Sequence, residues 1–297
     1  MATAPQSAGN HRATSARGEL LDGFSLEATM PTRAEVDALR DLVPAGTLVY
    51  LSAPPNQPAE RQIAAARDVA AAGFVAVPHV VARAFASQAR LDDFMARMAG
   101  EAGVTTVLAI AGDLAQPAGP FADALALIRS DVLQRHGVTG IGIAAYPDGH
   151  PQIADGALNA ALNEKLDEAF IRGLGVHIVT QFCFDPEQIL AWLRRIRYAR
   201  VDVPVRIGVA GPTSMRGLLR YALRCGVRAS LKGLVNPKAS QLIGEVAPDR
   251  IIDTLADAVS LRNLEPLALH FFSFGGLVHT ARWAIAAGGQ RASVSAG

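Results

Sequence analysis

The sequence contains few of the residues that cross-link secreted proteins or hold structural metals. Only two cysteines, Cys183 and Cys225, occur among its 297 residues, and neither belongs to a C-x-x-C pair. No H-E-x-x-H motif is present either, so the sequence predicts no disulfide framework and no zinc site. We expect both thiols to be reduced and buried, as in the cytoplasm.

Charge and long apolar runs are also scarce. Charged residues make up 19% of the chain, and the formal net charge is +1. Bulk attraction to nucleic acid or to an anionic membrane is therefore not expected. No apolar run approaches the ~18 residues that a membrane-spanning helix needs. Half of the residues are apolar, which favours a heavily buried, enzyme-like domain with one large core.

Residues 1–20 are expected to form a flexible N-terminal segment. They are rich in Ala, Ser, Thr and Gly, with scattered Arg and no acidic residue before Glu19. They lack the apolar stretch of a secretory signal. The composition leaves an organelle transit peptide open, although a frayed terminus is the simpler interpretation. Residues 21–297 are expected to form a single catalytic domain.

Eight short apolar runs alternate with amphipathic segments along the chain. The expected strands are 24–28, 47–53, 74–80, 105–111, 140–145, 176–182, 205–209 and 267–272. The expected helices are 32–42, 59–72, 91–102, 121–136, 157–172, 186–197, 214–225, an inserted stretch at 238–261, and 277–287. Thr32 and Glu35 form a capping box, Gly73 ends a helix, and Pro186 suits a first helical turn.

Continuous apolar strands that alternate with helices are typical of a parallel sheet covered on both faces. Eight such units in one domain favour an α/β fold closed into a (β/α)8 TIM barrel. An open, doubly wound sheet is the alternative. The absence of G-x-G-x-x-G after any expected strand weighs against that alternative.

Polar residues interrupt or follow the apolar strands near their carboxyl ends, where a β/α barrel places its reacting groups. They are Ser25, Glu27, His79, Asp113, Tyr146, His150, Gln181, Asp185 and His270. Six of the eight expected strands therefore direct a polar group toward one rim. Each residue alone also has a structural interpretation, such as a rim carboxylate paired with an arginine or an aspartate in a turn. Loops are generally polar, but these residues lie within or directly after the strands, which makes a shared site the better interpretation.

Five segments, in order and similarly spaced, resemble the methylenetetrahydrofolate reductase family of FAD-dependent barrels. They are S-L-E at 25–27, P-H at 78–79, G-D-L at 112–114, Y-P-D-G-H-P at 146–151 and T-Q-F-C-F-D at 180–185. The segment L-H-F-F at 269–272 resembles the last strand of that family, so the resemblance spans about 24–283. The fourth and fifth segments are specific, whereas S-x-E or G-D alone would be weak signals.

The resemblance implies an oxidoreductase that converts 5,10-methylenetetrahydrofolate into 5-methyltetrahydrofolate. It implies FAD as cofactor and NAD(P)H, either NADH or NADPH, as the hydride donor in a ping-pong reaction. The same catalyst run in reverse would serve methyl-group catabolism. The family further suggests a cytoplasmic homo-oligomer, a dimer or tetramer, in one-carbon metabolism and methionine biosynthesis.

The resemblance also assigns roles to individual residues. Glu27 matches the general acid that protonates N10 of the folate, and an acid that works near neutral pH needs a raised pKa, which desolvation can supply. Asp113 and Gln181 match residues that bind the pterin. His270 is expected to be structural. The expected FAD contacts are His79, Gly112, Asp113, Ala122, Tyr146, His150 and Lys165.

Three departures from the family pattern stand near these residues. Ala111 replaces the usual arginine before G-D, the pair at 54–55 is P-P instead of threonine and tyrosine, and S-F-G-G at 273–276 replaces T-L-N-R. The lost arginine would be expected to bind the glutamate tail of folate, so we expect that role to pass to Arg216, Lys232 or Arg282. The departures leave open a folate- or methyl-carrier-binding barrel without flavin. A barrel aldolase or lyase is disfavoured, because no lysine stands at a strong strand end.

Overall fold

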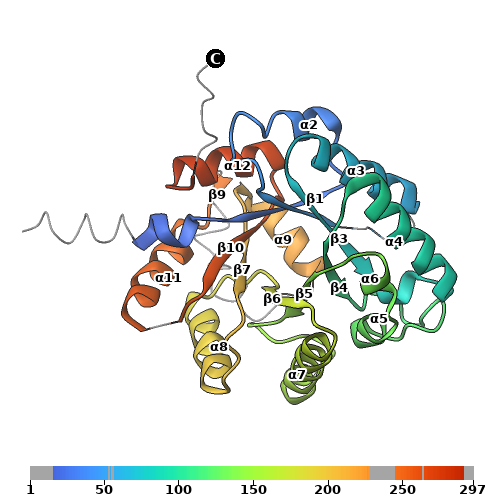
Figure 1. Ribbon diagram of the computed structural model, residues 1–297. Helices are drawn as coiled ribbons and strands as arrows, with labels where there is room; N and C mark the ends of the chain where they lie inside the picture. Colours follow the sequence, from blue (N-terminus) through green and yellow to red (C-terminus); the bar gives the residue numbers. More distant parts are fainter. Residues whose placement is uncertain are drawn as a thin grey trace, which may run out of the picture.

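Eight parallel strands close into a barrel in the order β1-β10-β7-β6-β5-β4-β3-β2. The computed structural model describes residues 16–52, 54, 57–225, 227, 245–262 and 264–290. Helices surround the ring of strands (Figure 1). The expected (β/α)8 barrel is thereby confirmed. Within the described residues, no helix is both long and apolar enough to span a bilayer.

Most elements lie close to their expected bounds, but the helix expected at 32–42 ends at Asp37, and the described part of the stretch expected at 238–261 is helical only from Asp249. The barrel strands are β1 (Ser25–Thr29), β2 (Leu48–Ser52), β3 (Val75–Val81), β4 (Thr106–Ile110), β5 (Gly140–Ala145), β6 (Gly175–Thr180), β7 (Val205–Ala210) and β10 (Leu267–Phe272). The helices are α2 (Arg33–Asp37), α3 (Ala59–Ala71), η1 (Ala82–Ala84), α4 (Gln88–Ala102), α5 (Ala124–Arg129), α6 (Val132–Arg135), α7 (Asp155–Ile171), α8 (Pro186–Tyr198), α9 (Met215–Arg224), α11 (Asp249–Arg262) and α12 (Leu277–Ala286). Two short strands, β8 (Thr213–Ser214) and β9 (Glu245–Val246), pair antiparallel in a separate sheet.

Capping side chains define several helix ends. The Thr32 side chain accepts a hydrogen bond from the backbone N–H of Glu35, whose side chain accepts one from Thr32 in return. This is the expected capping box. The single helix expected over 121–136 is wrong, because the segment forms two short helices, α5 and α6. Asp131 breaks it with a φ of +60°, outside the right-handed helical region.

The packed part of the chain begins earlier than residue 21. Residues 16–21 are helical, so the expected flexible segment 1–20 is too long. The guanidinium of Arg17 bonds to the carboxylates of Asp249 and Asp253 on α11. It also donates to the carbonyl of Ala287 at 3.1 Å. This arginine therefore ties the start of the described chain to its last two helices.

Small residues on the strands leave room for rings inside the barrel. A β-carbon on Gly142 of β5 would lie 2.9 Å from Nε2 of His177. A β-carbon on Gly208 of β7 would lie 2.3 Å from the carbonyl oxygen of Thr180. Side chains on the other face of the strands pack beneath the helices in the main apolar core. Gly142 thus leaves room for the ring of His177, whereas Gly208 permits the backbone after β6 to approach β7 closely.

Candidate active site

A tyrosine and three histidines meet inside the barrel. Tyr50 lies on β2 and His177 on β6, with three strands between them on either side of the ring. Yet Oη of Tyr50 lies 2.7 Å from Nε2 of His177, so this hydrogen bond crosses the interior. The Tyr50 ring also packs edge-on against His270, at 4.6 Å between centroids, and against His79, at 6.5 Å. The interior is therefore polar and aromatic.

Glu27 supplies the carboxylate of this cluster. Its Oε2 lies 3.4 Å from Nε2 of His79 on β3 and 3.4 Å from Nε2 of His270 on β10. The Glu27 side chain is 14% exposed, whereas that of His270 is completely buried. The carboxylate therefore lies between a closed interior and solvent. No group of three His, Cys, Asp or Glu side chains in the described ranges is arranged to hold a metal ion.

The pKa of Glu27 is about 2, below its ordinary value of 4.5. Burial alone would raise this pKa, but the charge on His79, the hydrogen bond from His270 and the close approach of His79 together outweigh burial and lower it. The raised pKa expected from the sequence is therefore wrong for the protein without ligand. The apolar neighbours of Glu27 along β1 suggested desolvation, whereas the two imidazoles come from other strands.

His270 is held at both ring nitrogens. Oγ of Ser25 lies 3.0 Å from Nδ1 of His270, while Nε2 faces Glu27. Ser25 and His270 are partners in the register of β1 and β10, and both are fully buried. Burial lowers the pKa of His270, although the hydrogen bond and charge of Glu27 oppose this. The histidine expected to be structural thus links Ser25 to the candidate acid.

Arg206 on β7 is a cation inside the same barrel. Its guanidinium donates to the carbonyl of Gly23 at 2.9 Å. Burial lowers the pKa of His177 to about 3, and the charge of Arg206 contributes to the lowering. Burial raises the pKa of Tyr50, so its hydroxyl stays protonated and shares a hydrogen bond with Nε2 of the neutral His177. The sequence interpretation missed these three side chains, although each is a polar residue inside an otherwise apolar strand.

A second group of predicted residues gathers beyond the ends of β4 and β5. Burial raises the pKa of Tyr146, and the charge of Asp113 adds to this, which places the two side chains near each other. The Tyr146 ring packs edge-on against His150 at 5.3 Å. Gly112 has a φ of +90°, and a β-carbon there would lie 2.3 Å from Cγ1 of Val81. Only glycine fits this turn.

Arg83 in η1 braces the loop that follows β4. Its side chain donates from Nε to the carbonyl of Ala122 at 2.7 Å and from Nη1 to the carbonyl of Leu114 at 2.9 Å. Its backbone N–H donates to the carbonyl of Ala111 at 3.0 Å. The sequence interpretation missed this arginine. It holds the loop in which alanine replaces the arginine usual in the family that the sequence resembles.

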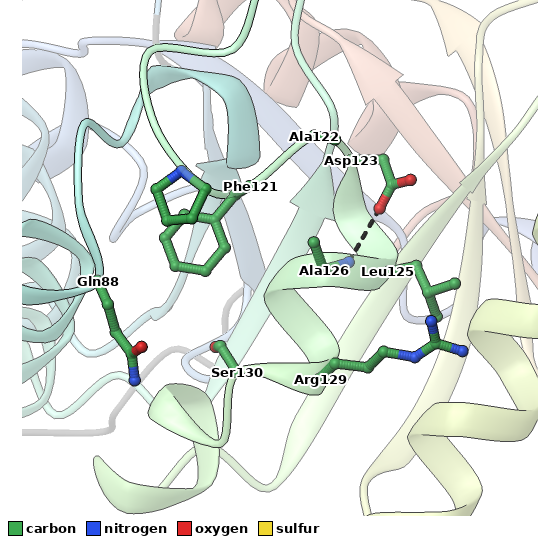
Figure 2. A pocket seen from close by; sticks show the side chains of 9 residues that line it. Gln88, Phe121, Ala122, Asp123, Leu125, Ala126, Arg129 and Ser130 are labelled. Carbon is green, nitrogen blue, oxygen red and sulfur yellow. Dashed lines mark hydrogen bonds between the residues drawn. The ribbon is translucent and has the colours of Figure 1, made fainter.

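Lys165 on α7 lies near Asp123, the residue before α5. Burial lowers the pKa of Lys165, and the charge of Asp123 opposes this. Ala122 and Asp123 also line a pocket of about 380 Å³, together with Gln88, Phe121 and residues of α5 (Figure 2). The lining comes from helices and the loop before α5, and from no barrel strand. This pocket is therefore separate from the Glu27 cluster.

Gln181 follows β6 and uses half of its amide on the backbone. Its Oε1 accepts a hydrogen bond from the N–H of Phe182 at 3.0 Å. Within the described part of the chain, its amide NH₂ group makes no hydrogen bond. The half-buried side chain thus keeps two donors that a ligand can use.

Aromatic rings form a wall beside this residue. Phe182 packs against Phe272 at 5.2 Å and Phe274 at 5.0 Å, and Phe274 stacks on Tyr221 at 4.1 Å. The departure at 273–276 therefore contributes an aromatic ring. Of the residues expected to bind a glutamate tail, Arg216 and Arg282 are exposed, and Lys232 lies outside the described residues, as does one proline of the pair at 54–55.

The predicted site residues thus fall into three groups. Glu27 and His79 are in direct contact inside the barrel. A second group beyond β4 and β5 contains Gly112, Asp113, Tyr146 and His150, and a third beside α5 and α7 contains Ala122 and Lys165. Gln181 directly follows β6 and precedes Phe182, the first ring of the aromatic wall.

Comparison with known proteins relates the chain to one family. The family model described as methylenetetrahydrofolate reductase matches residues 52–232, more than half of the chain. The chain belongs to the methylenetetrahydrofolate reductase family. The match includes His79, Asp113 and Gln181, whereas Glu27 and His270 lie outside it.

Two curated members of the methylenetetrahydrofolate reductase family illustrate the similarity. Methylenetetrahydrofolate reductase 2 of Saccharomyces cerevisiae is 30% identical over 139 residues, which cover 44% of this chain and 23% of the yeast protein. Methylenetetrahydrofolate reductase (NADH) 1 of Arabidopsis thaliana is 30% identical over 155 residues, covering 46% of this chain and 25% of the plant protein. The alignments thus span about a quarter of the length of these relatives.

Solved structures show the same architecture at low sequence identity. A Clostridium thermocellum protein described as binding two copies of 5-methyl-5,6,7,8-tetrahydrofolic acid has a TM-score of 0.56 and 11% identity, covering 95% of this chain and 98% of its own. Dihydropteroate synthase from Thermus thermophilus has a TM-score of 0.50 and 17% identity, covering 89% of this chain and 91% of its own. At such identities the likeness is one of fold.

Proposed function

We propose that this member of the methylenetetrahydrofolate reductase family reduces 5,10-methylenetetrahydrofolate to 5-methyltetrahydrofolate. FAD is the cofactor, NAD(P)H is the donor, and Glu27 protonates N10 of the folate. The observation that carries the proposal is the carboxylate of Glu27, which lies 3.4 Å from two imidazole nitrogens inside the barrel. A carboxyl group joined to imidazoles can hold or release a proton, as opening of the folate's five-membered ring requires.

The side chains beyond β4 and β6 suit the pterin. The exposed carboxylate of Asp113 can accept hydrogen bonds from amino groups, and the free NH₂ group of Gln181 can donate to ring nitrogen or oxygen atoms. Phe272, the register partner of Glu27, adds an apolar ring next to the acid. Together they would orient the heterocycle so that N10 faces Glu27.

Residues of the second and third groups fit FAD. Lys165 is a largely desolvated cation that forms no ion pair with any described residue, which suits a diphosphate. Tyr146 and His150 offer polar atoms and ring faces, and Gly112 permits a close turn. When bound, FAD supplies the hydride that these side chains cannot provide. His79 contacts Glu27 inside the barrel. A contact between His79 and FAD would therefore require the cofactor to approach this residue from the interior.

We infer that Glu27 and His79 together hold the proton that N10 receives. Without ligand, the carboxylate of Glu27 is ionised beside His79. A folate that covers Glu27 would remove its remaining contact with water and favour the neutral form of both groups. The proton would then move from His79 to Glu27 and on to N10. The carboxyl group therefore needs its high proton affinity only while substrate is bound.

Anaerobic half-reactions test this function. Purified protein reconstituted with FAD should be yellow and should bleach with NADH or NADPH, and methylenetetrahydrofolate should restore the colour. Glu27→Gln should keep bleaching by NAD(P)H and lose reoxidation by the folate. The matched control is Glu187→Gln, an exposed residue in the first turn of α8, which should retain both steps. Equal loss of both half-reactions in Glu27→Gln would contradict the acid role.

A folate-binding barrel without flavin is the second candidate function. It is supported by Ala111 and the P-P pair at 54–55, and by the folate ligand of the Clostridium thermocellum protein. A colourless protein that FAD does not stabilise, but that binds methyltetrahydrofolate tightly in equilibrium dialysis, would support it over the reductase.

A further inference from the structure

We propose that the two histidines beside Glu27 have different tasks: His79 returns a proton to Glu27 after each turnover, whereas Ser25 and His270 hold the carboxylate in place. The inference rests on the proposed role of Glu27 as the acid. Both imidazoles lie 3.4 Å from the same oxygen, Oε2 of Glu27. Their other contacts distinguish them.

His270 has no path to solvent. Its side chain has zero exposure, Nδ1 lies 3.0 Å from Oγ of Ser25, and Nε2 faces Glu27. The Ser25 hydroxyl lies 3.0 Å from Nδ1 and 3.4 Å from the carbonyl of Leu269, and we take the shorter contact as its acceptor. With the hydroxyl donating to Nδ1, the ring proton stays on Nε2 and is directed at the carboxylate. Ser25 thereby selects the tautomer of His270 that donates to Glu27.

The surroundings of His270 keep its ring neutral. The titratable and charged groups that face it are Glu27 on β1, Tyr50 on β2, His79 on β3, His177 on β6 and Arg206 on β7. Burial lowers the pKa of His270 most, and the charges of His79 and Arg206 lower it further, with only Glu27 opposing. A ring whose two nitrogens are both engaged and that resists a second proton cannot supply one at each turnover.

His79 has a different position. Its Nε2 is shielded from solvent and lacks a hydrogen bond of normal geometry, although the carboxylate of Glu27 lies 3.4 Å away. The side chain retains 9% exposure, which must come from atoms other than Nε2. One edge of the ring therefore reaches solvent while Nε2 at the other edge faces Glu27, so a turn of the ring connects the two.

The transfer balances in three steps. The Nε2–H bond of protonated His79 breaks as the O–H bond of Glu27 forms. That O–H bond breaks as the N10–H bond of the folate forms. Neutral His79 then keeps its remaining proton on Nδ1, so the ring must turn to bring the bare Nε2 to solvent, take one proton there and turn back. With that turn, each turnover consumes one solvent proton and leaves both side chains as they began.

Parallel variants test the division of tasks. His79→Ala should slow turnover with folate by about 10²-fold, and added imidazole should restore much of it. His270→Ala should be slowed but not rescued, because its site is closed. Ser25→Ala should change the pH profile of turnover, and Ser25→Thr, which keeps the hydroxyl, should restore it. Rescue of both histidine variants, or of neither, would overturn the proposal.

A second measurement does not depend on the reaction. The carboxylate stretch of Glu27, assigned by infrared difference spectra against Glu27→Gln, can be titrated in the ligand-free protein. His79→Gln should move its midpoint upward, since the charge on His79 is removed. A midpoint that stays unchanged would overturn the role of His79 even if the protein proved to be a reductase, while failure of folate reduction with a shifted midpoint would count against the proposed function alone.

Discussion

Replacement of Glu27 by glutamine should destabilise the protein by an amount that depends on pH. Glutamine has the shape of the neutral carboxylic acid and cannot ionise. The pKa of Glu27 in the folded protein is about 2, against 4.5 for the ordinary group. Since the folded-state pKa is the lower one, the ionised carboxylate stabilises the fold above pH 4.5, and this stability is lost as the pH falls toward 2. The difference corresponds to about 3 kcal/mol at pH 7.

The side chain of Glu27 is only 14% exposed, so screening by water reduces this value little. Urea denaturation followed by far-ultraviolet circular dichroism at pH 7, 5, 4 and 3 would measure it. The gap between the parent protein and Glu27→Gln should fall from about 3 kcal/mol at pH 7 to roughly 1.4 kcal/mol at pH 3.

His177 destabilises the fold on acidification through its own lowered pKa, but this effect is common to both proteins and cancels in the comparison. Glu187→Gln, at an exposed site, should show no comparable gap at any pH. A gap for Glu27→Gln that stays constant from pH 7 to pH 3, or a variant more stable than the parent at pH 7, would refute the assignment of Glu27 as an ion held by imidazoles.

Three further changes test the barrel interior and the loop after β4. Tyr50→Phe leaves Nε2 of His177 buried without its hydrogen-bond partner at 2.7 Å and should lower the free energy of unfolding by about 1–3 kcal/mol in urea titrations. Gly142→Ala places a methyl group 2.9 Å from His177 and should lower the free energy of unfolding by about 1–3 kcal/mol, measured by thermal melts. The control is Gly156→Ala on α7, whose methyl group would meet nothing within 4 Å and which should be neutral or slightly stabilising in those melts. Arg83→Ala removes two hydrogen bonds to loop carbonyls, so amide hydrogen exchange should rise in residues 111–123 and leave the barrel strands unchanged.

The barrel follows from local properties of the sequence. Each strand is an apolar run of its own, and the alternation with helices is enough to predict the closed parallel sheet. The capping box at Thr32 is equally local, because both partners lie within one turn. The break at Asp131 was missed because a residue with a φ of +60° leaves no mark in an amphipathic pattern.

The candidate site depends on register, which the sequence pattern does not contain. Glu27 and His270 are 243 residues apart, and they meet because Ser25 pairs with His270 across β1 and β10. Family resemblance supplied Glu27 and His79 as separate residues with separate roles. Their contact, and the resulting fall in the pKa of the acid, follow only from three strands arranged in one ring.

Tyr50, His177 and Arg206 form a polar layer inside the barrel that affects both the stability of the fold and the pKa values of the nearby histidines. Barrels of this class are usually filled by branched apolar side chains, whereas Tyr50, His177 and Arg206 occupy this interior. Buried polar groups cost free energy unless they are paired, and here the pairing is nearly minimal: one bond between Tyr50 and His177 and one from Arg206 to a carbonyl. Burial, and to a smaller extent the charge of Arg206, lower the pKa of both His177 and His270, which keeps those rings neutral. Replacing this layer by valine and leucine would therefore be tolerated or even stabilising for the fold. Because burial is the largest cause of the lowered pKa of His270, that ring would stay neutral beside Glu27.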